Sequence, residues 1–341
     1  MRTKLFFLLL LLASLLWIWL RSQTDLEQYT LNGATMGTSY NVKIVEPVTH
    51  IIDQTALHND IDSLLYDINH IMSTYIENSE ISLFNKAPAH EWISISQNLC
   101  DIFNVAIETS RKSSGAFDIT VGPLVNLWGF GPEHNASDLP SEVDIQARKN
   151  RTGFQHLKIQ NQPPAALKSI DSMYCDLSAI AKGWGVDRVA EFLESKGYHN
   201  YLVEIGGEIR AKGVNVHKGP WRIGVSSPNE LSGIQKVIEV LDVGIATSGD
   251  YRNYFEMGGV RYSHTIDPRT GRPITHNVAS VTVIYTSCMM ADAYATAINV
   301  LGLEQGMMLA EKENLPVLMI VKTENGFVEK KTPSFEAYIS K

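Results

Sequence analysis

The chain has 341 residues, of which 44% are hydrophobic, and 29 lysines and arginines face 37 aspartates and glutamates, a formal net charge of −8. This composition excludes a disordered chain, a collagen and a disulfide-rich scaffold, which need low hydrophobicity, periodic glycine and dense cysteine respectively. The acidic balance, without any lysine- or arginine-rich run, also predicts that the protein binds no nucleic acid.

The first 21 residues have the pattern of a membrane-targeting segment. Lys4 precedes sixteen apolar or small residues, 5–20, and Arg21 returns the chain to a polar composition. No convincing small-x-small cleavage site follows, so we expect an uncleaved anchor rather than a cleaved signal peptide. The basic residues ahead of the apolar run predict that the body, residues 22–341, is exported.

Lipidation of this leader is not expected. Leu12-Ala13-Ser14 would open a bacterial lipoprotein box, but Leu15 stands where the lipidated cysteine would be. Without its leader the body has a net charge of −11, because the leader contains three basic and no acidic residues.

The first half of the body alternates strand-like and helical patterns. Apolar residues alternate in 40–44, and helical spacing follows in 56–72 and 97–112. Residues 131–168 are rich in proline, asparagine and charge, which predicts a surface excursion with a short helix over 141–149. A further helix is predicted over 179–196, ended by Gly197.

The second half is dominated by strands. Segments 201–205 and 208–211 are predicted strands separated by two glycines, 251–256 and 260–266 form a predicted hairpin, and 278–285 is a strand. Ser287 can cap a helix that runs to Leu301, before Gly302. Hairpins interrupted by long helices favour an α+β fold with antiparallel sheets over an alternating parallel fold.

The common nucleotide and hydrolase motifs are missing. The sequence contains no GxxxxGK[ST], GxGxxG, HExxH or GxSxG pattern. The glycines of this chain must therefore serve a different kind of site.

The helix after Ser287 is apolar around most of its circumference, so we expect it to be buried. Its polar residues Asp292, Thr296 and Asn299 share one stripe. They could form a solvent-facing stripe or an internal hydrogen bond. Alternatively, a carboxylate and a hydroxyl could face a cleft and hold a hard cation, since Mg²⁺ prefers oxygen ligands.

A second polar constellation spans Asp176, Ser178 and Lys182, where a strand end meets a helix start. Free backbone N–H groups, the helix dipole and a lysine would suit a phosphate. Simple capping with a solvated lysine is the alternative interpretation.

Two further segments carry aromatic or titratable groups. Residues 115–131 place aromatic rings among glycines, which could sandwich a flat ring or form a packed turn. His264 stands on a predicted strand before a turn, where a histidine is either structural or available for acid–base chemistry.

Taken together, eight segments in order resemble the ApbE family of FAD:protein FMN transferases, over about residues 30–325. They are residues 33–38, 72–75 with 79–80, 115–131, 176–187, 204–207, 247–252, 264–268 with 270–271, and 291–296. The resemblance implies two tandem T-fold-like units with packed helices and an FAD cleft between them. It also implies export to the periplasmic face of the bacterial inner membrane.

The resemblance further implies a reaction and a set of site residues. Such enzymes use Mg²⁺ to split FAD and attach its FMN half to a threonine, occasionally serine, of a membrane flavoprotein subunit, releasing AMP. Mg²⁺ would be held by the carbonyl of Ala179 and the side chains of Asp292 and Thr296. FAD would be bound by Met36, Tyr75, Ala116, Phe117, Asp118, Asp176, Lys182 and Ile266.

The acceptor hydroxyl must lose a proton, and His264 is the preferred general base, with Asp292 or a metal-bound water as rivals. Two other activities remain open at this stage. Water could replace the acceptor, which would make the protein an FAD pyrophosphatase, or the protein could bind FAD without catalysis.

Overall fold

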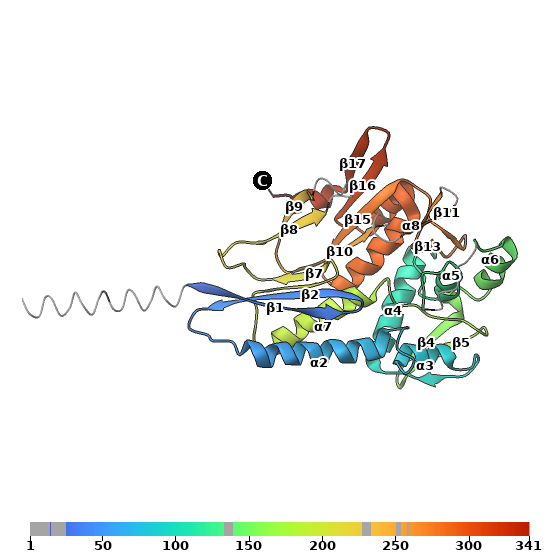
Figure 1. The fold of residues 1–341 in the computed structure, drawn as a ribbon, viewed down its shortest axis with the longest axis horizontal. Coiled ribbons are helices and arrows are strands. Elements are labelled where there is room, and N and C mark those ends of the chain that lie inside the picture. Colours follow the sequence, from blue (N-terminus) through green and yellow to red (C-terminus); the bar gives the residue numbers. More distant parts are fainter. Residues whose placement is uncertain are drawn as a thin grey trace, which may run out of the picture.

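The computed structural model describes residues 14, 25–132, 139–226, 233–249, 254–257 and 260–340. At its centre lies one eight-stranded sheet in which all neighbours are antiparallel (Figure 1). In spatial order its strands are β1 (Leu26–Thr35), β2 (Thr38–Pro47), β6 (Tyr201–Ile205), β7 (Glu208–Lys212), β10 (Val243–Gly249), β15 (Val278–Tyr285), β16 (Val317–Thr323) and β17 (Gly326–Lys331).

The sheet is built from two halves of similar plan. Each half contributes a pair of strands, then a helical section, then a second pair of strands: β1 and β2 with β6 and β7, then β10 and β15 with β16 and β17. This repetition agrees with the predicted tandem α+β units. The helices are α2 (Gln54–Met72), α3 (Glu80–Lys86), α4 (Gln97–Lys112), α5 (Gly122–Leu127), α6 (Glu142–Lys149), α7 (Ala181–Ser195) and α8 (Cys288–Lys312).

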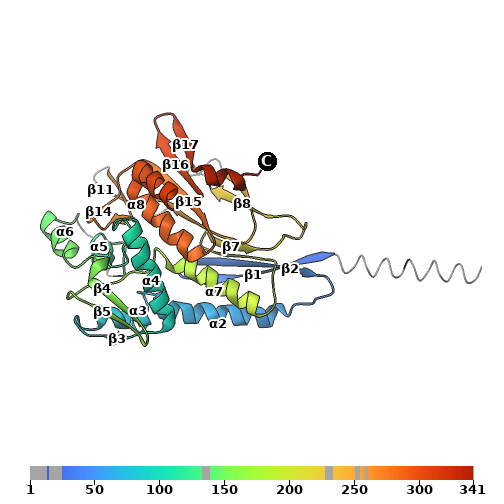
Figure 2. The same ribbon diagram turned by 180° about the vertical axis from the view of Figure 1, so that it is seen from behind.

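One face of the sheet is covered by α2, α7 and α8, and α4 packs beside α8 (Figures 1 and 2). The main core lies between these helices and the sheet, because alternate strand residues such as Val42, Ile44 and Val203 point to that side. The opposite face carries a second core of intervening residues such as Val45 and Leu202. It is closed by the hairpin of β8 (Trp221–Ser226) and β9 (Ile234–Val240) and by the 3₁₀ helix Pro333–Tyr338.

The remaining strands form small satellite sheets. They are β3 (Ile93–Ser94), β5 (Pro164–Lys168) and β4 (Leu157–Asn161) in one sheet, the hairpin of β11 (Tyr254–Met257) with β12 (Val260–Ser263), and the pair β13 (Ile266–Asp267) with β14 (Arg272–Pro273). A short 3₁₀ helix, Phe154–His156, precedes β4.

Most predicted elements are confirmed to within a few residues, but two predictions need correction. The surface excursion predicted over 131–168 contains the paired strands β4 and β5 besides the expected helix α6. The last predicted helix does not stop at Gly302. That glycine takes a left-handed φ of 74°, which breaks the helical geometry locally, and helix resumes up to Lys312.

Two predicted features lie partly outside the described residues. All of the leader except Ser14 lies outside the described residues. Gly258 and Gly259, in the turn of the predicted hairpin, lie outside them as well. Within the part of the chain that the structure describes, no helix has the length and apolar character needed to cross a membrane.

Candidate active site

The start of α7 lies directly against α8. Gly183, in the first turn of α7, donates its backbone N–H to the Asp292 carboxylate at 3.0 Å. A Cβ at residue 183 would lie 2.5 Å from the carbonyl oxygen of Cys288 and 2.8 Å from the Cβ of Asp292. Only glycine permits this approach without displacement, so the sequence Lys182-Gly183 brings the lysine to the helix that carries Asp292.

Lys182 is paired with a second acidic residue that the sequence interpretation missed. Its ammonium lies 2.7 Å from the carboxylate of Glu208, the first residue of β7, which is only 2% exposed. Asp292 is also buried, at 5% exposure. If all three groups are ionised, the cluster of Lys182, Glu208 and Asp292 has a net charge of −1.

The three groups influence one another's protonation. Burial raises the pKa of Glu208 to about 7; the positive charge of Lys182 opposes this shift and the negative charge of Asp292 adds to it. Burial also raises the pKa of Asp292, against the effects of Lys182 and the Gly183 N–H. For Lys182, burial lowers the pKa, but the carboxylates of Asp292 and Glu208 outweigh burial and leave it raised.

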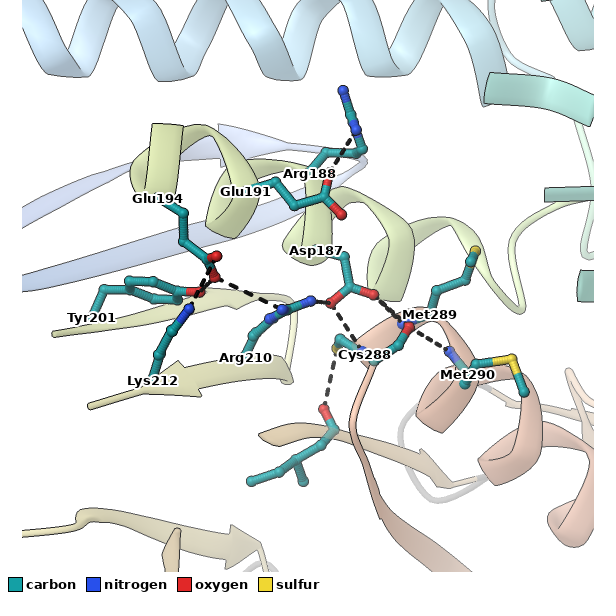
Figure 3. Close-up of polar contacts among 12 residues, drawn as sticks. Asp187, Arg188, Glu191, Glu194, Tyr201, Arg210, Lys212, Cys288, Met289 and Met290 are labelled. Carbon is teal, nitrogen blue, oxygen red and sulfur yellow. Dashed lines mark hydrogen bonds and ion pairs between the residues drawn. The ribbon is translucent and has the colours of Figure 1, made fainter. Parts of the chain in front are cut away.

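A carboxylate on α7 holds the first turn of α8 in place (Figure 3). One oxygen of Asp187 accepts the backbone N–H of Cys288 at 3.0 Å and an Arg210 guanidinium N–H at 2.8 Å. The other accepts the hydroxyl of Ser287 at 2.7 Å and the backbone N–H of Met289 at 2.9 Å. Asp187 thus satisfies two of the N–H groups that a helix start leaves without intrahelical partners.

Asp187 and Gly183 are four residues apart and lie on the same side of α7. Both contact α8, one at its first turn and the other at Asp292. This double attachment fixes the relative position of the two helices, and with it the position of Lys182 relative to Asp292.

The polar stripe of α8 does not face solvent, so that alternative is wrong. Asp292 and Asn299 are both buried, and the Asn299 amide donates to the Ser248 hydroxyl at 3.2 Å. Thr296, one turn after Asp292, is partly exposed. Within the described ranges its hydroxyl makes no hydrogen bond, and Asp292 receives only the Gly183 N–H.

The described residues contain no cluster of three or more histidine, cysteine, aspartate or glutamate side chains suited to a metal. The predicted site needs no such cluster, because it combines one carboxylate, one hydroxyl and the carbonyl of Ala179. Ala179 is partly buried and stands two residues before α7 begins, not inside that helix as the sequence suggested.

Met36 lies near the same helix. It occupies the two-residue turn between β1 and β2, where Met36 and Gly37 both take left-handed φ values, 49° and 71°. A Cβ at Gly185 of α7 would lie 2.8 Å from the Met36 methyl carbon. The turn therefore places Met36 against α7 at Gly185, which lies three residues after Lys182 along the helix.

A second group of predicted residues surrounds Asp176. Tyr75 is 72% exposed, and its pKa is raised by partial burial and by the negative charge of Asp176. The Asp176 carboxylate accepts the backbone N–H of Ser178 at 2.8 Å, while its own N–H donates to the Ile119 carbonyl at 2.7 Å. Asp176 shapes the turn before α7 and does not cap that helix, whose N-cap residue Ile180 makes no side-chain bond.

The predicted run 116–118 is built into the same turn region. Ala116 and Phe117 are buried in hydrophobic clusters, so a ligand contact from them would use their backbone. Burial raises the pKa of Asp118, whose carboxylate accepts bonds from the N–H and hydroxyl of Thr120 and from the N–H of Phe154. Asp118 therefore organises its own loop.

A third group contains His264 and Ile266. Ile266 is buried beside Leu124 and Trp128. His264 is partly exposed, and its ring meets the edge of Phe130 at a centroid distance of 6.4 Å. The Trp128 indole N–H donates to the Gly271 carbonyl at 2.9 Å, which fits the packed-turn interpretation of this glycine-rich segment.

The structure thus collects the predicted residues into three groups. Lys182, Asp292 and Met36 meet around α7; Tyr75, Asp118 and Asp176 gather in the preceding turns; His264 and Ile266 lie with the aromatic segment. Glu208 was missed because its partner, Lys182, belongs to another element of the fold.

Comparisons with known proteins show the family of the chain. Residues 36–319 match the model of the ApbE family. The FAD:protein FMN transferase of Vibrio cholerae is 50% identical over 316 residues, covering 92% of this chain and 94% of that protein. The FAD:protein FMN transferase of Escherichia coli K12 is 38% identical, covering 92% and 90%.

Solved structures share the fold. The flavin transferase ApbE from Vibrio cholerae superimposes with a TM-score of 0.86 at 48% identity, over 92% of this chain and 100% of that chain. The apo flavinyl transferase ApbE of Pseudomonas stutzeri gives 0.85 at 38% identity, over 92% and 98%. This chain belongs to the ApbE family.

Proposed function

We propose that this protein is an FAD:protein FMN transferase, which moves the FMN half of FAD to a threonine or serine hydroxyl of an acceptor protein and releases AMP. The observation that carries this proposal is the hydrogen bond from Gly183 to Asp292, which brings the adjacent Lys182 to the helix that carries this buried carboxylate. It is supported by the family membership and by the names of the relatives.

The residues present fit a magnesium ion. Asp292 is buried and, among the residues that the structure describes, receives one hydrogen bond, while the Thr296 hydroxyl one turn further on receives none. These two side chains, with the Ala179 carbonyl, form an all-oxygen donor set, and the negative net charge of the cluster favours a cation. When bound, such a cation supplies charge stabilisation to the reacting pyrophosphate.

The chain's own groups account for the rest of the proposed reaction. Lys182 would place a positive charge beside the FAD pyrophosphate, and the exposed ring of Tyr75 would offer a flat apolar surface to an aromatic ring of FAD. Met36, Asp176, Ile266 and the backbone of 116–118 would complete the FAD site.

In the transfer step the acceptor oxygen bonds to the FMN phosphorus, and the bond from that phosphorus to the bridging oxygen breaks. AMP leaves with the bridging oxygen. The proton of the acceptor hydroxyl passes to a general base, for which His264 is the preferred residue and Asp292 a rival. If His264→Ala retained full transfer while Asp292→Ala lost it, His264 would not be that base.

The same proposal includes location and partners. Residues 1–21 would anchor the protein at the periplasmic face of the inner membrane without lipidation, and residues 22–341 would form the catalytic domain. Membrane flavoprotein subunits would be the acceptors.

One experiment separates the transferase from other activities. The body is incubated with FAD, Mg²⁺ and a candidate acceptor subunit, and the products are weighed. An acceptor heavier by one FMN moiety supports the proposal; free FMN and AMP with an unmodified acceptor would indicate a pyrophosphatase, and unchanged FAD a binding protein. Chelation of Mg²⁺ by EDTA should abolish the transfer.

A further inference from the structure

Glu208 is a buried carboxylate to which the proposed reaction gives no role. It is 2% exposed, and its charged partner is the Lys182 ammonium at 2.7 Å. Burying a carboxylate can cost stability even within an ion pair, because the loss of hydration can exceed the attraction between the two charges. Its position next to a lysine of the site suggests a function beyond packing.

The backbone around Glu208 is shaped for this pair. Gly206 and Gly207 form the turn between β6 and β7 with left-handed φ values of 62° and 107°. A Cβ at Gly206 would lie 2.8 Å from the Thr38 methyl and 3.3 Å from the Cδ of Lys182. The glycine turn therefore lets the strand that begins with Glu208 approach the lysine side chain closely.

We propose that Glu208 is a positioning residue that holds the Lys182 ammonium in place beside Asp292 and, through its own charge, favours a cation in the site. The part concerning the cation rests on the proposed function. The part concerning the position of Lys182 rests only on the geometry of β7 and α7.

The charges make this role distinguishable from simple packing. With Glu208 ionised, two carboxylates share one lysine, so Asp292 keeps part of its negative charge for a cation. Without the Glu208 charge, Lys182 would pair with Asp292 alone and compete with the cation. Loss of the Glu208 charge would also lower the repulsion felt by the anionic pyrophosphate of FAD. The affinity for the cation and the affinity for FAD should therefore change in opposite directions.

The variant Glu208→Gln keeps the shape and removes the charge. Glu204→Gln is the matched control, because Glu204 lies in the same hairpin and, within the described part of the chain, accepts only the Gly207 N–H, a bond that glutamine can keep. At about pH 8, where Glu208 is largely ionised, Mg²⁺ binding is measured by calorimetry without FAD, and FAD binding by flavin fluorescence with EDTA.

We expect Glu208→Gln to weaken Mg²⁺ binding about tenfold while FAD binding is unchanged or tighter, and Glu204→Gln to alter neither. Glu208→Asp, which restores the charge, should recover part of the Mg²⁺ affinity. If Glu208→Gln weakened Mg²⁺ binding and FAD binding equally, or changed neither, the cation part of the proposal would be overturned.

The position of Lys182 is tested without ligands. Acetic anhydride labels lysines, and peptide mass spectrometry compares Lys182 with the exposed Lys158 of the same chain. In Glu208→Gln, Lys182 loses its ion pair, so its labelling relative to Lys158 should rise about threefold or more, since an ion-paired amine reacts slowly. Unchanged labelling would overturn the positioning role. If the wild type bound neither Mg²⁺ nor FAD, the proposed function would fail, and the labelling would still decide the role of Glu208.

Discussion

The backbone N–H of Gly183 donates to the carboxylate of Asp292 at 3.0 Å, across the contact between α7 and α8. These residues are 109 positions apart in the chain. The bond links α7 to α8 next to Lys182, in the first turn of α7. The site therefore depends on how closely these two helices approach each other.

A methyl group at residue 183 should disturb this approach. Gly183→Ala would force a Cβ to within 2.5 Å of the Cys288 carbonyl oxygen, so the helices must separate. We expect a loss of about 1–3 kcal/mol of unfolding free energy, measured by urea denaturation, and a clear fall in FMN transfer. Gly219→Ala is the control, because its Cβ would meet nothing nearer than 3.9 Å. Equal stability of the two variants would contradict the close-contact account.

Asp187 should be a major source of stability at the start of α8. Asp187→Asn would replace one acceptor oxygen by a donor and remove the nearer charged partner of Arg210, at 2.8 Å, leaving Glu194 at 3.8 Å. The expected loss is about 3 kcal/mol in unfolding free energy. Asp60→Asn removes an exposed ion pair with Lys196 and should cost under about 1 kcal/mol. Similar losses in the two variants would mean that the Asp187 network does not fix α8.

The elevated pKa of Glu208 predicts a pH dependence of stability. Its folded-state pKa, about 7, lies above the ordinary value of 4.5, so the folded protein binds this proton more tightly than the unfolded chain. Its contribution is complete below about pH 4.5 and is lost as the pH rises through 7, which amounts to about 3 kcal/mol.

Urea denaturation of the metal-free protein at several pH values between 4.5 and 8 checks this dependence. Glu208→Gln should show a flatter decline than the wild type, whereas Glu204→Gln should follow the wild type. Parallel profiles for Glu208→Gln and the wild type would show that Glu208 does not titrate in this range.

Tyr75 should contribute to FAD binding and not to stability. Its side chain is 72% exposed beside Asp176, so little protein packing is lost on truncation. Tyr75→Ala should raise the KM for FAD about tenfold, and Tyr75→Phe should keep most of the affinity. Tyr66→Ala is the control, since Tyr66 is another exposed tyrosine, on α2. An unchanged KM in Tyr75→Ala would remove Tyr75 from the FAD site.

Local patterns in the sequence predicted much of the fold. Helix α4 and strand β15 follow from apolar spacing alone, because α4 buries one side against the core and β15 buries both of its faces. Strands β4 and β5 escaped prediction because they are short, lie among prolines and polar residues, and depend on pairing with each other.

The candidate site was predictable in part for a similar reason. Asp292 and Thr296 stand out because they are among the few polar residues in the largely apolar segment 288–301 of α8. Glu208 and Asp187 do not stand out, since their partners Lys182 and Cys288 come from other elements, 26 and 101 positions away. Tertiary pairing of this kind leaves no local signal in one sequence.

The most direct test of the account is the intact mass of an acceptor subunit after incubation with FAD, Mg²⁺ and either the wild type or Asp292→Asn. The account predicts that the wild type adds one FMN moiety and that Asp292→Asn, although folded by circular dichroism, adds none. Equal modification of the acceptor by both proteins would show that the contact between α7 and α8 is not the centre of the reaction.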